Sequence, residues 1–439
     1  MTIQMNLLRL GFRTLVAGGF AVMLLVPAAQ AIEIEEVVSP KGIKAWLMND
    51  PSDQMISISF SFEGGDLQDP AGKEGLTPLM IDLMDKGAGD LDREAFATRL
   101  YKTGTGFSLR SSSDLVSGSI KLLPGEEQEP LELLALALKA PRFDQDAIDQ
   151  AKGVVYAALE DKKNDPDSLG WEKFGKAFYG EHPLGSITTA ETIKAITRDD
   201  LIERHKALLA RSNLTVGVAG TISKEELSKV LDDVFGDLPE KAGVEPVAPP
   251  EPKFGVTVHQ AYNRPQTSIA LVYPGIPNSS QDLYTSNVLV NLMGGGMTSR
   301  LFMELREKRG LTYGAGASSA LSRDWGLVYV STSTRAASAN EALEVARDVV
   351  KQIAEGDISQ KEVDAAKSYM KGAVIMDSLG TTSQIARTLV NLQRLNRPID
   401  YLDKLEKLYE AVTLEDVKKL AAKLLSQEPA VLIVGQGDS

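Results

Sequence analysis

Few side chains in this sequence of 439 residues have the type and spacing that catalysis or metal binding requires. The absence of cysteine excludes disulfide bonds, thiolate nucleophiles, cysteine-bound zinc and iron–sulfur clusters. The three histidines are His182 in a loop, His205 in a predicted helix and His259 at the end of a predicted strand. None has a partner at the spacing of metal ligands, and the Gly-x-Ser-x-Gly motif of serine hydrolases is missing. The common hydrolytic and histidine-rich metal-binding patterns are therefore absent from the sequence.

Two carboxylates, Asp82 and Asp85, lie on one face of a predicted helix, and Glu74 comes shortly before it. Carboxylate oxygens are the ligands that hard divalent cations prefer. Oxygen-only sites, however, usually draw their ligands from loops with several carboxylates, whereas this helix offers only two, at i and i+3. A solvated helix face is therefore the favoured interpretation, with a metal site as the alternative.

A second group of candidates is basic and phenolic: Arg306 and, seven positions later, Tyr313. Arg306 falls late in a predicted helix that Gly310 ends, and Tyr313 opens the following predicted strand. A guanidinium and a phenol can both donate hydrogen bonds to a peptide carbonyl and stabilise a developing oxyanion. On spacing alone, the favoured interpretation is a half-buried strand tyrosine after a basic, solvated helix end, where Arg300 and Arg309 are just as suitable as Arg306.

Hydrophobic spacing predicts the elements that hold these side chains. Apolar residues recur at helical spacing before the stop signal Gly87, and Pro78 is tolerated because it lies in the first turn. These apolar residues are Leu76, Leu79, Met80, Leu83 and Met84. Period-2 alternation predicts strands over residues 55–62, 267–273 and 327–332. Strands mixed with helices, without strict βαβ alternation, favour an α+β fold with antiparallel-rich sheets.

The chain divides into two halves around residues 239–253, where five prolines in fifteen residues predict an extended linker. A helix that opens at Thr197 and a strand that begins at Leu214 recur near Thr413 and Ala430, with nearly the same offset. A shared order of elements at one offset suggests duplication, although a coincidence between common α/β patterns is the alternative.

Residues 1–31 have the features of a signal peptide: two arginines, an apolar run and the small-x-small sequence Ala29-Gln30-Ala31. The apolar run is about a dozen residues, short of the roughly 20 that span a bilayer. We therefore expect cleavage and export to a bacterial periplasm as a soluble chain, with an uncleaved membrane anchor as the alternative. The net charge of −13 argues against a nucleic-acid partner or an anionic membrane.

The segment from Asp69 reads Asp-Pro-x-Gly-x-x-Gly-Leu, then a helix, then Lys-Gly. This pattern resembles the zinc-helix region of the pitrilysin/insulinase family, in which the helix carries His-x-x-Glu-His. The resemblance places the two histidine positions at Pro78 and Asp82 and the general-base position at Ile81. The third ligand of the family, a glutamate on another helix, aligns with Ala158.

The same resemblance implies that zinc binding is lost in the first half, whereas the family's substrate-contacting Arg and Tyr survive in the second half. One carboxylate does not bind catalytic zinc at useful strength, and an isoleucine cannot accept a proton. Residues 294–313 resemble the family segment whose Arg and Tyr, seven residues apart, reach the substrate from the C-terminal half. Arg306 and Tyr313 match that pair.

The resemblance thus implies two homologous halves of mixed, antiparallel-rich sheet with helices, joined into a clamshell. The expected organisation is a signal peptide over residues 1–31, an N-terminal peptidase-like domain with a degenerate zinc helix over residues 32–238, a Pro-rich linker over residues 239–253, and a C-terminal peptidase-like domain over residues 254–439.

In function, the resemblance implies a zinc-free, non-catalytic subunit of a heteromeric zinc metallopeptidase. Such a subunit binds extended peptide, and its Arg306 and Tyr313 complete the active site of a zinc-bearing homologous partner. No cofactor is expected on this chain, and zinc is expected in the partner. One alternative is a structural or scaffold subunit with no role in hydrolysis. Another is an autonomous peptidase with an unusual metal site, which the missing base disfavours.

Overall fold

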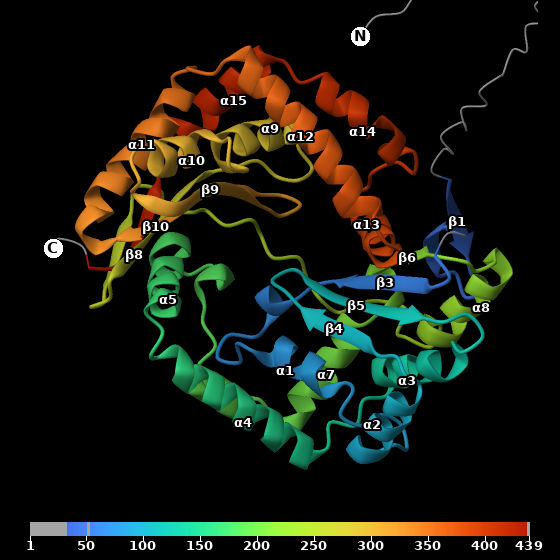
Figure 1. Ribbon diagram of the computed structural model, residues 1–439. Coiled ribbons are helices and arrows are strands. Elements are labelled where there is room, and N and C mark those ends of the chain that lie inside the picture. Colours follow the sequence, from blue (N-terminus) through green and yellow to red (C-terminus); the bar gives the residue numbers. More distant parts are fainter. Residues whose placement is uncertain (1–32, 51–52, 437–439) are drawn as a thin grey trace, which may run out of the picture. The chain divides into compact units, whose positions relative to one another are not determined.

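The computed structural model describes residues 33–50 and 53–436 (Figure 1). The predicted signal peptide, residues 1–31, lies outside the described residues, so its cleavage remains a prediction. A search of the described helices finds none that combines the length and the apolar character needed to cross a membrane.

Each side of the linker forms one mixed sheet, in which most neighbouring strands are antiparallel. The first sheet has the order β1 (Ile34–Val38), β2 (Lys44–Met48), β6 (Leu214–Ala219), β3 (Ile56–Glu63), β5 (Leu115–Leu122) and β4 (Phe107–Ser111). The second has the order β7 (Thr257–Ala261), β11 (Ala430–Gly435), β8 (Gln266–Pro274), β10 (Gly326–Arg335) and β9 (Thr312–Leu321). The parallel pairs are β2–β6 in the first sheet and β7–β11 in the second. The α+β fold class with antiparallel-rich sheets is confirmed.

Helices cover one face of each sheet and enclose a separate hydrophobic core. The helices before the linker are α1 (Leu76–Leu83), α2 (Arg93–Lys102), α3 (Gln128–Lys139), α4 (Gln145–Lys162), α5 (Pro166–Tyr179), α6 (Ala190–Ala195), α7 (Arg198–Leu208) and α8 (Lys224–Phe235). Those after it are α9 (Leu283–Gly294), α10 (Arg300–Phe302), α11 (Ala339–Ala354), α12 (Gln360–Leu379), α13 (Thr382–Arg394), α14 (Tyr401–Glu410) and α15 (Leu414–Leu425). Alternation decides which strand residues enter the core: Ile58, Phe60 and Phe62 of β3 are buried among α1, α3 and α8.

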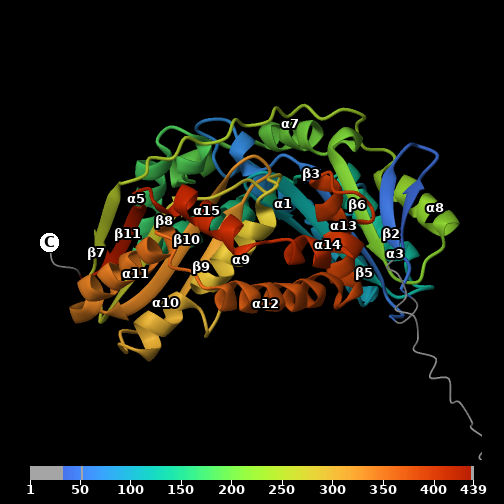
Figure 2. The same cartoon turned by 90° about the horizontal axis from the view of Figure 1, so that it is seen from above.

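One helix from each half packs on the opposite face of the other half's sheet. From before the linker, α5 places Phe174 and Phe178 against Val272 and Leu432 of the second sheet. From after the linker, α13 packs Ala386 and neighbouring apolar residues on β6 and β2 of the first sheet. Both views show α5 beside the second sheet and α13 beside the first (Figure 1, Figure 2).

Glycines allow both close approaches. A Cβ atom on Gly217 of β6 would lie 2.3 Å from the backbone oxygen of Ala386, so only glycine lets α13 settle at this depth. A Cβ atom on Gly170 of α5 would lie 2.6 Å from a methyl group of Val434. The first clash is with backbone and the second with the end of a side chain, so the α13 contact is the less forgiving of the two.

Residues 239–253 contain neither helix nor strand, and backbone hydrogen bonds hold them along the first half. The amide of Arg211 donates to the carbonyl of Pro239 over 2.8 Å, and the amide of Gly243 donates to the carbonyl of Ala207 over 2.7 Å. At the far end, the amide of Lys253 donates to the carbonyl of Phe178. The linker is therefore fixed at both ends rather than hanging free.

Candidate functional site

The helix that resembles the zinc helix, α1, is anchored at its N-terminus by a buried polar network. The carboxylate of Asp69 accepts hydrogen bonds from the amides of Gly75 and Thr77 and from the Thr77 hydroxyl. Arg204 of α7 lies 3.8 Å from the same carboxylate and donates to the Thr77 hydroxyl and to the carbonyl of Gly65, each over 2.8 Å. The Asp-Pro motif thus caps α1 and ties it to α7. Sequence reasoning recorded Asp69 only as part of a motif and missed Arg204.

The four positions aligned with the family's zinc site lie on α1 and α4, which pack against each other. Pro78 is half-buried, whereas Asp82 of α1 and Ala158 of α4 are exposed. Ile81, at the general-base position, is only 3% exposed and belongs to the core. Ile81 falls outside the apolar stripe that the sequence predicts for this helix. It is buried nevertheless, because α4, α7 and β4 all contact α1.

These side chains do not fit a zinc ion. Asp82 is the sole donor among the aligned positions, since proline, isoleucine and alanine offer no side-chain ligand. Asp85 is instead paired with Lys86 over 2.7 Å. Across residues 33–50 and 53–436, no three His, Asp or Glu side chains gather closely enough to hold a metal ion, so Asp82, Asp85 and Glu74 form no such group.

The segment that carries Arg306 begins as α10 and continues as one π-helical turn, Met303–Glu307. The amide of Lys308 closes this turn on the carbonyl of Met303 over 3.0 Å, a five-residue separation. Single π turns inside helices are frequent at functional sites because they redirect the side chains that follow. Tyr313 then lies near the start of β9, the edge strand of the second sheet.

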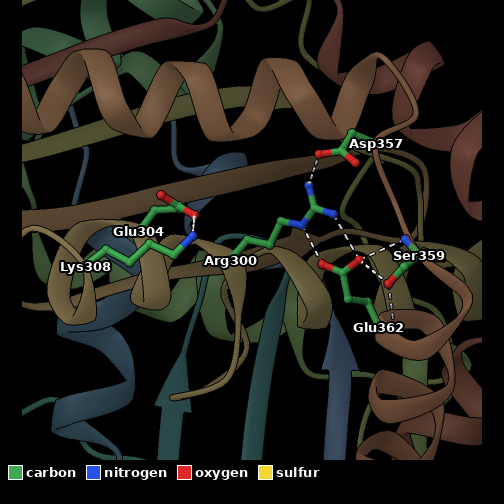
Figure 3. Close-up of polar contacts among 6 residues, drawn as sticks. All are labelled: Arg300, Glu304, Lys308, Asp357, Ser359 and Glu362. Carbon is green, nitrogen blue, oxygen red and sulfur yellow. Dashed lines mark hydrogen bonds and ion pairs between the residues drawn. The ribbon is translucent and has the colours of Figure 1, made fainter.

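Arg300 fixes this segment to the start of α12 (Figure 3). Its Nε and Nη2 atoms bind the two carboxylate oxygens of Glu362 at 2.5 and 3.0 Å, and Nη1 binds Asp357 at 3.0 Å. Glu362 also caps α12 by accepting from the amide of Ser359. Burial opposes the ionisation of Glu362, but the hydrogen bonds from Arg300 and Ser359 outweigh it and lower the pKa of Glu362 to about 2.

The three arginines of the segment are used differently. Arg309 and Lys308 both bind the carboxylate of Glu304, each over 2.5 Å (Figure 3 shows the lysine contact). The side chain of Arg306 makes no hydrogen bond within the described part of the chain. It stacks on the ring of Phe302, with 4.8 Å from the guanidinium carbon to the ring centroid, and the nearest carboxylate, Glu307, lies 3.8 Å away.

The side chain of Tyr313 is 87% exposed. Arg306 and Tyr313 therefore lie on a segment that other contacts hold in place, and their side chains make no hydrogen bond with a described residue. Arg300 and Arg309, by contrast, are hydrogen-bonded to carboxylates of their own chain. Contact of either Arg306 or Tyr313 with substrate remains a prediction.

Each histidine ring contacts the protein backbone. Nε2 of His182 lies 2.9 Å from the carbonyl of Ala248 in the linker, and Nε2 of His205 lies 2.8 Å from the carbonyl of Leu138. Nε2 of His259 lies 3.2 Å from the carbonyl of Gly435. Burial lowers the pKa of His205, which favours its neutral form. These contacts join neighbouring elements, and none of the three rings belongs to a group of metal-ligating side chains among the described residues.

Two family models match consecutive parts of the chain. The one described as Insulinase (Peptidase family M16) matches residues 44–192, and the one described as Peptidase M16 inactive domain matches residues 195–370. The chain belongs to the M16, or insulinase, family of peptidases.

Relatives and solved structures agree with this assignment. The chain is 24% identical over 403 residues to the uncharacterized zinc protease YmxG of Bacillus subtilis, covering 91% of this chain and 98% of the relative. It is 26% identical over 368 residues to the non-peptidase homolog YmxG of Helicobacter pylori, covering 82% and 84%. A crystal structure of a peptidase M16 inactive domain from Pseudomonas fluorescens superposes with a TM-score of 0.86 at 25% identity, covering 93% and 99%.

The comparisons and the replaced residues together define a non-catalytic M16 member. The match to an inactive-domain model covers most of the second half. In the first half, the positions that the resemblance aligns with the zinc ligands and the base hold proline, aspartate, alanine and isoleucine, which lack the ligand set and the base of zinc-dependent hydrolysis.

Proposed function

We propose that this chain is the zinc-free subunit of a heteromeric zinc peptidase. In this assembly it binds peptide in extended form, and it contributes Arg306 and Tyr313 to the active site of a homologous, zinc-bearing partner. The contrast among the three arginines of the Arg306 segment carries the proposal. Arg300 and Arg309 each have carboxylate partners within the chain, whereas Arg306 has none within hydrogen-bonding distance.

The chemistry of the pair suits a substrate carbonyl. The guanidinium of Arg306 offers several N–H donors in a rigid plane, and the phenol of Tyr313 offers one O–H donor. Donors of this kind stabilise the negative charge that develops on a carbonyl oxygen during peptide hydrolysis. Because the Arg300–Glu362 contact and the π turn hold the segment, the donors need little rearrangement when a substrate arrives.

Extended peptide binding is supported by the free edges of the two sheets. The strand β4 forms one edge of the first sheet, and β9, which contains Tyr313, forms one edge of the second. A peptide can add to such an edge through backbone hydrogen bonds. We also propose that the mature subunit acts in the periplasm, on the basis of residues 1–31, and cell fractionation with an antibody against the chain would test this location.

The decisive experiment combines the purified chain with its zinc-bearing M16 homologue from the same cell. We expect the chain alone to show no peptide cleavage and no stoichiometric zinc by elemental analysis. We expect the mixture to elute as a larger species in size-exclusion chromatography and to cleave peptide. Assembly without any gain in cleavage would instead favour a scaffold subunit. Tightly bound zinc and cleavage by the chain alone would overturn the proposal.

A further inference from the structure

The face of the first sheet that points away from its core is lined with serines and basic side chains. Along β3, the side chains of Ser57, Ser59 and Ser61 alternate with the buried apolar residues. Strand register extends this surface across the sheet, because directly paired residues share a face. One row contains Ser61, Ser117 and Arg110, and the next contains Ser59, Ser119 and Ser108.

Helix α13 covers only part of this face, and a pocket of about 400 Å³ remains beside it. Three arginines line the pocket: Arg110 from the edge strand β4, and Arg387 and Arg394 from α13. Serines of β3, β4 and β5 form its floor together with Gly118. The lining therefore combines guanidinium and hydroxyl donors from two parts of the sequence nearly 280 residues apart.

The donors of this pocket are largely unengaged within the chain. The side chains of Arg110 and Arg387 make no ion pair or hydrogen bond with a described residue, and both are exposed. Arg394 is only 16% exposed; Asp114 lies 3.9 Å from its guanidinium, and Glu63 is a second nearby carboxylate. The Nε atom of Arg394 and the hydroxyl of Ser61 are both buried without a hydrogen-bond partner. Buried polar atoms in proteins nearly always have partners, so these two atoms indicate a place for a ligand.

The charge of the pocket contrasts with that of the molecule. Among the described residues, three arginines and no carboxylate line the pocket, and the carboxylates near Arg394 are Asp114 and Glu63, in a chain whose net charge is −13. The overall field would repel an acidic ligand, so attraction of such a ligand requires a local positive site. Arginine is the residue best suited to a carboxylate because its planar fork can donate two parallel hydrogen bonds.

We propose that this pocket binds a carboxylate of the peptide that adds to the edge of β4, so that the subunit selects acidic peptide segments. This inference rests on the proposed function, since it assumes that the chain binds extended peptide. The carboxylate can come from an Asp or Glu side chain or from the C-terminus of the peptide, because Arg110 lies on the edge strand itself.

The test uses the full chain and three fluorescent peptides of one Val/Thr-rich sequence, with binding measured by fluorescence anisotropy. The first peptide carries Glu at its centre and a C-terminal amide, the second has Gln in place of Glu, and the third has Gln and a free C-terminal carboxylate. We expect the Glu peptide or the free-carboxylate peptide to bind roughly ten-fold more tightly than the uncharged one. Which of the two is preferred identifies the source of the carboxylate.

Two variants then locate the effect. R110Q and R387Q change exposed side chains, so we expect both to fold normally and to lose most of the preference for the charged peptide. The matched control is R335Q, which removes an exposed arginine at the end of β10, outside the pocket, and should keep the preference. If the preference survives in R110Q and R387Q, or if R335Q abolishes it equally, the pocket is not the site that recognises the carboxylate.

The outcomes separate this inference from the proposed function. Equal binding of all three peptides, with normal activation of the zinc-bearing homologue, overturns the carboxylate pocket and leaves the proposed function standing. Failure of every peptide to bind overturns the pocket and removes peptide binding from the proposed function as well. A charged-peptide preference without activation of the homologue would support the pocket alone.

Discussion

The two sheets share an architecture but present different chemistry on the face away from their cores. In the first sheet, the pocket beside α13 is lined with serines and three arginines. In the second, a pocket of similar volume, about 400 Å³, lies beside α5. It also has hydroxyl side chains, but it has no arginine among its described lining residues, and Trp171 and aliphatic residues such as Leu432 and Val434 complete its lining. Its one acidic residue, Asp167, is already paired with Arg264 over 2.5 Å.

A second difference concerns the residues of catalysis. In the first half, the positions that the resemblance aligns with the zinc site offer one possible ligand, Asp82, and α1 is largely packed into the core. In the second half, the side chains of Arg306 and Tyr313 make no hydrogen bond with a described residue, and the contact between Arg300 and Glu362 holds their segment in place. This difference teaches that two halves can share strand order and helix packing, which depend on many backbone contacts, while the side chains on their free surfaces differ.

The largest expected effect tests the unengaged pair of the second half. In the mixture with the zinc-bearing homologue, R306A should lower the turnover of peptide by about 100-fold, because loss of one oxyanion donor typically has that effect. Y313F should act in the same direction, and neither change should alter the elution volume of the complex. The control is Y101F, since Tyr101 on α2 is as exposed as Tyr313, at 87%. Unchanged turnover in R306A would mean that the second half, like the first, contributes only structure to the complex.

The next largest effect concerns α5 and α13, each of which packs on the sheet of the other half. G217A should lower the free energy of unfolding by about 1–3 kcal/mol, because the added methyl group meets the backbone of α13. G170A should cost less, since it meets only a valine methyl group that can rotate away. The control is G153A on α4, where nothing lies within 4 Å, and urea titration of the three variants gives the comparison. A G170A variant less stable than G217A would contradict the stated asymmetry.

The contact between Arg300 and Glu362 in the second half gives the third prediction. E362Q should destabilise the chain at pH 7 by about 1–3 kcal/mol, because it weakens the hydrogen bonds with Arg300 and the cap of α12. The folded-state pKa of Glu362 is about 2, below the ordinary value of 4.5, so its contribution is present above pH 4.5 and declines as the pH falls toward 2. Thermal unfolding against pH should therefore show the curves of E362Q and the unchanged chain converging in acid, while E344Q on α11 has no effect.

Asp66, in the first half, predicts a smaller dependence of stability on pH, with the opposite sign. Burial raises the pKa of Asp66 to about 6, and its Oδ1 atom is buried without a hydrogen-bond partner. The folded state therefore holds this proton more tightly than the unfolded chain, and stability falls as the pH rises from about 4 to 6. D66N should remove the penalty and raise the unfolding temperature at pH 8, with little change at pH 4. Equal shifts at both pH values would contradict this assignment.

Much of the fold follows from local patterns in the sequence. The strands predicted over residues 55–62 and 267–273 correspond to β3 and β8, and the helix that follows Gly75 corresponds to α1. Alternation and helical spacing identify such elements because each reflects which side of a single element is buried. The capping sequence at Thr197 likewise predicts the start of α7, where Thr197 caps the helix.

The rest depends on contacts between distant segments, which no local pattern specifies. The apolar faces of α5 and α13 show that each helix is covered, yet they do not say which sheet covers it. The alternating serines of β3 indicate a strand with one polar face, whereas the pocket exists only because Arg387 and Arg394 come from a helix more than 300 residues later. Ile81 illustrates the same point, since its burial depends on α4 and α7.

The exchange of α5 and α13 makes the two halves inseparable in practice. Cleaving the backbone within residues 239–253 would free neither piece, because each would still hold a helix seated on the other's sheet. Expressed singly, each piece would expose an apolar strip that its missing helix normally shields, and it would tend to aggregate. Encoded as two separate polypeptides, the halves would be expected to behave as an obligate pair. Both would therefore have to be synthesised at the same time.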